Sequence, residues 1–134
     1  MKKKDRKIIA EIGSVHDGSF GNALKLVEAV ANCSADYVKF QLHIPEEEMV
    51  DNAPNPPYFN EESRLDYFNR ILFSPSQLEK LLNFCKKKKI EFLCSPFSNK
   101  AVDILLEIGV KNFKIASGEV TNHPLLKKIT KKKC

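Results

Sequence analysis

The chain has 134 residues and a mass of 15.2 kDa, which corresponds to one domain, and its 43% of hydrophobic residues excludes an intrinsically disordered chain. No apolar run approaches the ~18 residues of a transmembrane span, and the first apolar run, residues 8–10, is too short for a signal peptide. The net charge of +5 lies largely in three lysine runs without interleaved aromatic residues (2–4, 86–89 and 131–133), which argues against a nucleic-acid partner.

The first half of the chain is expected to contain two strands, one helix and a long loop. Residues 7–12 (KIIAEI) are predicted to form a strand that ends at Gly13, and residues 36–42 (DYVKFQL) a second strand. Between them, residues 22–32 place apolar side chains at helical spacing. Residues 43–62 contain Pro45, Pro54, Pro56 and Pro57, so we expect neither a regular helix nor a central strand there.

The second half is expected to contain four helices and two strands. After a helical pattern at residues 63–73, Ser74 and Pro75 provide the cap and the first-turn residue of the next helix. Gly109 is expected to end the helix that precedes it. The remaining predicted elements are a strand at 90–94, a helix at 99–108, a strand at 112–116 and a helix at 123–130.

This alternation of strands and helices predicts an α/β fold with parallel strands and right-handed crossovers. Two architectures fit the order of elements: an open doubly wound sheet, or part of a (β/α)8 barrel. A complete barrel takes ~250 residues, and this chain has about half of that length. No internal repeat or interdomain linker is found.

Polar side chains interrupt the predicted strands near their carboxyl ends. Lys39 and Gln41 lie two residues apart on one strand and therefore share a face. Buried parallel strands are usually almost continuously apolar, and α/β proteins bind ligands beyond the carboxyl ends of their strands. A buried ammonium group needs a counter-charge, which Glu11 and Glu119 can supply only in part, and two lysines beside hydroxyl groups indicate an anionic ligand such as a phosphate or carboxylate. The polar residues concerned are Glu11, Lys39, Gln41, Ser95, Lys114, Ser117 and Glu119.

Simpler interpretations stand beside this one. Lys39 could face solvent on an edge strand, and Lys114 could extend its ammonium group to water over apolar surface. His16, in the loop after the first strand, is either a ligand-facing group or a loop residue bonded to backbone. For His43 a solvated loop position is favoured, and His123 is expected to begin the last helix. Because the three histidines lie in separate segments, no metal is assigned to this chain.

The cysteines and aromatic residues receive structural interpretations. Four cysteines form neither a Cys-x-x-Cys pair nor a zinc-binding spacing, which predicts free thiols in a reducing cytoplasm (Cys33, Cys85, Cys94 and Cys134). The aromatic residues at 58–59 and 67–68 are interpreted as packing of the long loop onto the sheet edge, in preference to the lining of a sugar-binding mouth.

Five short motifs occur in order along the chain. They are residues 9–13 (IAEIG), 16–18 (HDG), 38–41 (VKFQ), 95–98 (SPFS) and 114–119 (KIASGE). Together they resemble the sialic acid synthase family, which includes N-acetylneuraminate synthase and its legionaminate and pseudaminate relatives. The resemblance runs from about residue 8 to the C-terminus, and the loop after residue 43 is similar to the bacterial branch of the family.

The resemblance implies a (β/α)8 TIM-barrel type of fold, of which residues 1–134 would be the N-terminal half, truncated to about the first four βα units. It implies a cytoplasmic transferase of sialic acid biosynthesis that condenses phosphoenolpyruvate with an N-acyl hexosamine such as N-acetylmannosamine. The expected products are phosphate and a nine-carbon 2-keto sugar acid.

The phosphoenolpyruvate contacts follow from the motifs that match. In this family, the lysines that match Lys39 and Lys114 hold the carboxylate and phosphate of phosphoenolpyruvate, and the hydroxyls that match Ser95 and Ser117 assist. The family often has Thr where this chain has Ser95. This assignment agrees with the interpretation of two cations and hydroxyl donors around a dianion.

The sugar-facing residues are carried over in the same way. The acids that match Glu11 and Glu119 are the expected catalytic residues, and together with Gln41 they face the sugar and the reacting carbons. His16 is counted among the substrate-binding residues. Where the family usually has Asn before this histidine, the chain has Val15, which weakens the expected polar contacts of the first loop.

The family's remaining parts are expected to be absent. The resemblance implies a divalent metal, Mn or Mg, whose histidine ligands lie in the second half of the barrel, and a small antifreeze-like C-terminal domain that reaches into the partner's site in a homodimer. We therefore expect an inactive or incomplete fragment. The alternatives are a non-catalytic half-barrel module that assembles with a separate chain, or another phosphoenolpyruvate-dependent aldol-type synthase.

Overall fold

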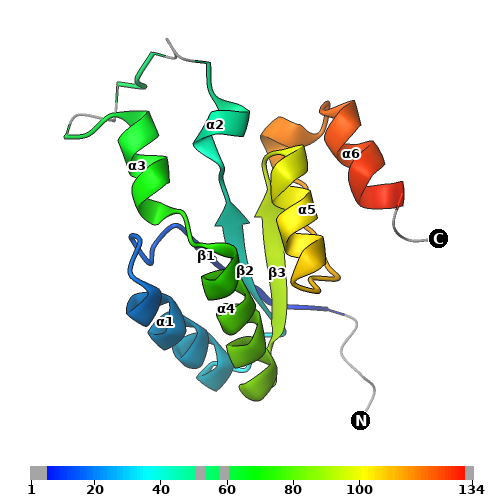
Figure 1. The fold of residues 1–134 in the computed structure, drawn as a ribbon. Helices are drawn as coiled ribbons and strands as arrows, with labels where there is room; N and C mark the ends of the chain where they lie inside the picture. The colour runs from blue at the N-terminus through cyan, green and yellow to red at the C-terminus, as the bar shows by residue number, and fades with distance from the viewer. Residues whose placement is uncertain (1–5, 51–53, 58–60, 132–134) are drawn as a thin grey trace.

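Residues 6–50, 54–57 and 61–131 are described by the computed structural model, in which three strands form one sheet (Figure 1). The strands β1 (Ile9–Gly13), β2 (Tyr37–Leu42) and β3 (Glu91–Pro96) lie in the order β1-β2-β3. Both neighbouring pairs are parallel, as helical crossovers between successive strands require. The predicted α/β class with a parallel sheet is confirmed.

Helices cover one face of this sheet. α1 (Phe20–Asn32), α4 (Pro75–Lys87) and α5 (Asn99–Glu107) lie along the strands, as Figure 1 shows. α6 (His123–Thr130) packs against α5, and an ion pair of 2.6 Å between Lys128 and Asp103 joins them.

Shorter elements follow the carboxyl ends of the strands. α2 (Pro45–Glu48) begins three residues after β2 ends, and α3 (Arg64–Ile71) follows in the same connection (Figure 1). The 3-10 turn η1 (Ser117–Glu119) comes shortly before α6. None of the helices in the described ranges is both long and apolar enough to cross a bilayer.

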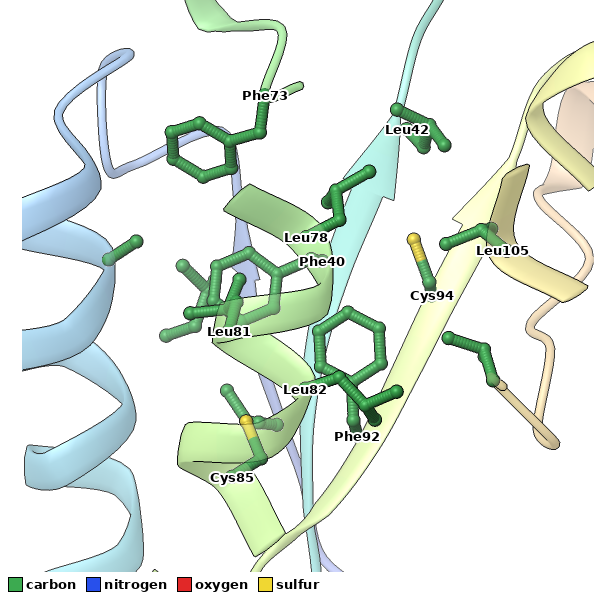
Figure 2. Close-up of a cluster of buried hydrophobic side chains, with 14 of the residues drawn as sticks. Phe40, Leu42, Phe73, Leu78, Leu81, Leu82, Cys85, Phe92, Cys94 and Leu105 are labelled. Atoms are coloured by element: carbon green, nitrogen blue, oxygen red, sulfur yellow. The ribbon is translucent and has the colours of Figure 1, made fainter. Parts of the chain in front are cut away.

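The core lies between the sheet and the covering helices. Side chains of β2 and β3 alternate between the two faces, and Phe40, Leu42, Phe92 and Cys94 point toward the helices (Figure 2). α4 contributes a stripe at helical spacing against them, made of Leu78, Leu81, Leu82 and Cys85. Each large apolar side chain buried in this way stabilises the fold by about 1.5–3 kcal/mol.

Local sequence signals explain where the helices begin. Ser74 caps α4 through a reciprocal capping box with Gln77, and Pro75 occupies the first turn, as predicted. Ser98 caps α5, because its hydroxyl accepts a hydrogen bond of 3.1 Å from the N–H of Ala101. The ends of most predicted elements differ from the observed ones by one or two residues.

Two predictions of local structure are wrong. Residues 112–116 do not form a strand, but make one parallel bridge between Cys94 and Phe113, beside a 3.0 Å hydrogen bond from the N–H of Lys114 to the carbonyl of Cys94. This segment has β3 on one side and no strand of the described residues on the other, so a second set of ladder bonds is missing. Residues 45–48 form a one-turn helix despite Pro45, which occupies the first turn, where its missing N–H is not needed.

Candidate active site

Four of the predicted site residues share the sheet face that points away from the core. Glu11 of β1 lies opposite Lys39 of β2, and Gln41 lies opposite Ser95 of β3. Since Val38, Phe40 and Leu42 belong to the helix-covered core, Lys39 and Gln41 project to the opposite face. The alternation in β2 therefore separates the apolar core from a polar face.

Lys39 is a buried cation with one carboxylate partner. Its side chain is 9% exposed and forms an ion pair with the Oε2 atom of Glu11, whose side chain is 47% exposed. A buried ammonium group requires a counter-charge, and the sequence predicted that Glu11 supplies part of it. Because Glu11 is open to water, part of the Lys39 charge remains available to an anion.

Ser95 is the unsatisfied polar group of this face. It is 1% exposed, and its hydroxyl has no hydrogen-bond partner among the described residues. A buried hydroxyl without a partner costs about 1–3 kcal/mol, which a ligand oxygen within reach would recover. The position of Ser95 beside Gln41 indicates that such a ligand would lie over the polar face.

The residues of the last motif lie on the segment that bridges to β3 and on η1. The bridge between Cys94 and Phe113 brings Lys114 to the side of β3 on which Ser95 lies. No ion pair joins Lys114 to any residue in the described ranges. Ser117 is exposed on η1, and the carboxylate of Glu119 accepts a 2.7 Å hydrogen bond from the side-chain amide of Asn122.

Gly13 makes room for two of these side chains. Its φ of +53° lies in the left-handed region, at a point where the register of β1 against β2 shifts. A Cβ atom there would lie 3.2 Å from Oε1 of Glu11 and 3.6 Å from Nε2 of Gln41. The glycine therefore allows both side chains to lie close to the backbone at the end of β1.

The structure does not bring His16 to this group. The residue is 3% exposed, and its ring stacks on Phe73 at 4.4 Å and lies 6.0 Å from the core residue Phe40. Its Nδ1 atom accepts a 3.2 Å hydrogen bond from the N–H of Gly18. Burial lowers the pKa of His16, against a smaller opposing effect of Asp17. Of the two open interpretations, that of a loop residue bonded to backbone fits these contacts.

The preference for a solvated His43 is wrong. Its ring stacks on Phe97 at 3.8 Å and lies 4.3 Å from the ring of Phe68. Its two nitrogens contact Glu48 at 2.7 Å and Gln41 at 3.3 Å. The sequence held one signal of this, since His43 continues the alternation of Lys39 and Gln41 beyond the end of β2. The aromatic partners come from distant segments and could not be read from the sequence.

Phe68 contacts the ring of His43 and that of its neighbour Tyr67. The interpretation of this aromatic pair as packing of the long loop onto the sheet edge stays a prediction. Residues 58 and 59, which were given the same interpretation, lie outside the described residues, as does Cys134. The free thiols predicted for Cys33, Cys85 and Cys94 are observed, and burial raises the pKa of Cys85 to about 12.

A divalent metal does not fit the described residues. Within residues 6–50, 54–57 and 61–131 there is no group of three or more histidine, cysteine or carboxylate side chains placed to hold an ion. Glu11 forms an ion pair with Lys39, and Glu119 accepts a hydrogen bond from Asn122.

The structure is that of an α/β protein with polar side chains at the carboxyl ends of parallel strands, which is where proteins of this class bind ligands. The chain belongs to the NeuB family, whose model matches residues 26–134. The family predicted from the five motifs is thereby confirmed.

Similar proteins support this assignment. The chain is 41% identical to N,N'-diacetyllegionaminic acid synthase of Campylobacter jejuni over 133 residues, which cover 96% of this chain and 40% of that protein. It is 33% identical to the human N-acetylneuraminate-9-phosphate synthase, with 93% and 36% coverage. The crystal structure of N-acetylneuraminic acid synthetase from Leptospira borgpetersenii, in complex with citrate, superposes with a TM-score of 0.73 at 29% identity, covering 92% and 41%. The chain thus spans about two fifths of the length of these relatives.

Proposed function

We propose that this chain carries the phosphoenolpyruvate-binding part of a sugar acid synthase of the sialic acid type, built as a (β/α)8 barrel when complete. The reaction joins phosphoenolpyruvate to an N-acyl hexosamine such as N-acetylmannosamine, with release of phosphate. Three carbons from the first substrate and six from the second give a nine-carbon 2-keto acid. The family, and the relatives named as legionaminic and neuraminic acid synthases, support this assignment.

Two cations and two hydroxyls are assigned to phosphoenolpyruvate. Lys39 and Lys114 hold its carboxylate and phosphate, and Ser95 and Ser117 donate hydrogen bonds to them. The observation that carries the proposal is the unpartnered hydroxyl of Ser95 beside buried Lys39 on the polar face. A buried donor without an acceptor and a cation with a half-exposed counter-charge are together suited to an incoming dianion.

The carboxylates and the amide are assigned to the sugar. Glu11 and Glu119 are the proposed catalytic residues, and Gln41 binds a polar group of the hexosamine. The new carbon–carbon bond joins the terminal carbon of phosphoenolpyruvate to the aldehyde carbon of the sugar, and one water balances the release of phosphate. Carboxylates near these carbons are suited to move the protons of these steps. The free thiols of Cys33, Cys85 and Cys94 fit the cytoplasm, where we place the protein.

Titration of the chain with phosphoenolpyruvate, followed by calorimetry or 31P NMR, tests the anion site. Lys39→Met and Lys114→Met should each weaken binding roughly 10- to 100-fold, because each removes a charged hydrogen-bond donor. Lys80→Met is the matched control, since Lys80 is exposed on α4. Equal affinities in all three variants, or no binding by the wild-type chain, would contradict the proposed anion site.

A second candidate function is assembly with a separate chain that supplies further strands. Ile9 is 49% exposed on the edge strand β1, and it lines a hollow of about 370 Å³ together with Tyr37 and Leu93. An exposed apolar strand edge favours pairing with another chain. Co-purification of a strand-bearing partner that restores phosphate release would favour this function, and a chain that stays monomeric in the presence of candidate partners would not.

A further inference from the structure

A hydrogen-bonded chain of three side chains ends at Gln41. The Nδ1–H of His43 donates to Oε2 of Glu48 at 2.7 Å. On the other side of the ring, Nε2 of His43 lies 3.3 Å from Oε1 of Gln41. Because an amide oxygen only accepts, this contact is a hydrogen bond in the ring form that carries a proton on both nitrogens. The series Glu48–His43–Gln41 thus joins the short helix α2 to the polar face of the sheet.

Glu48 is itself held in place. Its second oxygen, Oε1, accepts a hydrogen bond of 2.6 Å from the backbone N–H of Ile44. Both carboxylate oxygens therefore have partners, and the side chains of Glu48 and His43 are only 10% and 11% exposed. A carboxylate in this position keeps a proton on Nδ1 and fixes the plane of the ring, as carboxylates do for functional histidines elsewhere.

Aromatic packing fixes the ring from its faces. Phe97 stacks on His43 with an interplanar angle of 22°, and Phe68 contacts it with a tilt of 38°. Phe97 lies in the connection after β3, and Phe68 lies in α3. The ring of His43 is therefore held by two segments other than its own. A ring with its faces packed and one nitrogen anchored has little freedom to release Gln41.

We propose that His43 and Glu48 are positioning residues that hold the Gln41 amide in one orientation over the polar face. With one end of the amide tied to the ring, the other end lies toward Gly13 and Glu11. That end is left to bind a polar group of the ligand. The effect on a ligand rests on the proposed function, in which Gln41 contacts the hexosamine. The positioning of Gln41 by His43 and Glu48 does not depend on the proposed function.

The side-chain amide signals of Gln41 in a 15N–1H NMR spectrum test the positioning without any ligand. Gln41→Leu identifies the signals by their loss. Glu48→Gln removes the carboxylate at constant shape, and His43→Phe keeps an aromatic ring between Phe68 and Phe97 while removing both nitrogens. Each variant removes or loosens the contact at the amide oxygen of Gln41, so the side-chain N–H protons should reach water more often. Their hydrogen exchange should become about fivefold faster, a change of the size expected when one hydrogen bond that fixes the amide is lost.

Glu46→Gln is the matched control, since Glu46 is an exposed carboxylate on the same helix α2. This variant should leave the Gln41 signals where they are. Backbone signals of α1 show whether each variant folds, and the two test variants perturb packing in different ways. Unchanged Gln41 exchange in a folded Glu48→Gln or His43→Phe protein would overturn the proposal.

Added phosphoenolpyruvate separates this proposal from the proposed function. Its binding should be the same in wild type and Glu48→Gln, because the chain Glu48–His43–Gln41 does not include Lys39, Lys114 or Ser95. A Glu48→Gln protein that loses phosphoenolpyruvate binding would overturn the limited role given to Glu48. Absence of binding to the wild-type chain would contradict the proposed function alone, since Gln41 exchange is measured without ligand.

Discussion

Ser95 and Ser98 lie three residues apart and have opposite roles. The hydroxyl of Ser98 caps α5, whereas that of Ser95 is buried without a partner among the described residues. A side chain that finds no partner in the protein is a cost to stability, and a ligand site is a physical reason to keep it. The pair therefore contrasts a serine that caps a helix with one whose hydroxyl is left for the proposed ligand.

Substitution of these two serines should change stability in opposite directions. Ser95→Ala should be neutral or stabilise the chain by up to about 1 kcal/mol, because it removes an unsatisfied buried group. Ser98→Ala should destabilise it by about 1 kcal/mol through loss of the cap. Urea unfolding of both variants measures the difference. A marked loss of stability in Ser95→Ala would show that its hydroxyl has a partner in the folded protein.

His16 should make stability dependent on pH. Burial lowers its pKa below the ordinary value of 6.5, so the unfolded chain takes up this proton first as the pH falls. The contribution of His16 is therefore complete above pH 6.5 and is lost as the pH decreases toward the folded-state pKa. Protonation would also remove the acceptor of the Gly18 N–H.

Comparison of wild type with His16→Phe isolates this effect. Unfolding free energies measured between about pH 8 and pH 5 should fall more steeply for wild type than for the variant. All other titratable groups are shared by the two proteins, so their contributions cancel in the comparison. Parallel pH profiles would mean that His16 binds its proton equally well in the folded and unfolded chain.

At the residue scale, the sequence was sufficient wherever strand periodicity decides the outcome. The placement of Lys39 and Gln41 on one face, and the pairing of Glu11 with Lys39, follow from a period of two and from charge. The environment of His43 depends on Phe68 and Phe97, which the fold brings from other segments. Such contacts depend on tertiary packing and have no local signature.

At the scale of elements, the docking of α3 on the loop after β1 rests on Gly18. Arg70 of α3 forms ion pairs with Asp17 of that loop and with Glu62. A Cβ atom on Gly18 would overlap the backbone carbonyl oxygen of Arg70. The close approach of α3 to the end of β1 is therefore possible only because residue 18 has no side chain.

Gly18→Ala and Gly109→Ala form a matched pair that tests this contact. Both glycines have positive φ, at +78° and +88°, so alanine costs about 1–2 kcal/mol at either position. Only at residue 18 does a methyl group also meet backbone, which should cost about 1–3 kcal/mol more. Thermal or urea unfolding compares them. Equal losses of stability in the two variants would mean that α3 can shift away from residue 18 without a cost in free energy.

The elements themselves were largely predictable because caps, prolines and periodicity agree with the final fold. α6 begins and ends at the predicted residues, and the cap of α4 is the predicted Ser74. The strand expected at 112–116 failed because a strand depends on neighbours that the segment itself does not specify. Pro45 was misread because a proline excludes the interior of a helix and not its first turn.

At the scale of the whole molecule, the polar face of the sheet is open to solvent along β1. The side chain of Glu11 is 47% exposed, and Ile9 on the same strand is 49% exposed. Enzymes of condensation chemistry exclude bulk water from the reacting centre. The described residues therefore support binding of an anion better than completion of the reaction.

We accordingly expect this chain by itself to bind phosphoenolpyruvate but not to consume it. Incubation with N-acetylmannosamine and Mn or Mg, followed by a phosphate assay, should give the same signal as a Lys39→Ala control. Phosphate release above that control would show that the residues of this chain are sufficient for catalysis.

The alternation along β2 has a consequence for how such a protein can change over time. Odd-numbered positions such as 39 and 41 lie on the polar face, where the proposed ligand would bind, while even-numbered ones such as 38, 40 and 42 belong to the apolar core. Substitutions at the odd-numbered positions can alter ligand recognition without disturbing the packing of the core. Substitutions at the even-numbered positions can repack the core without altering ligand recognition. Loss or gain of a single codon within β2 would exchange the two sets, so we expect point replacements to be tolerated there far better than changes of length.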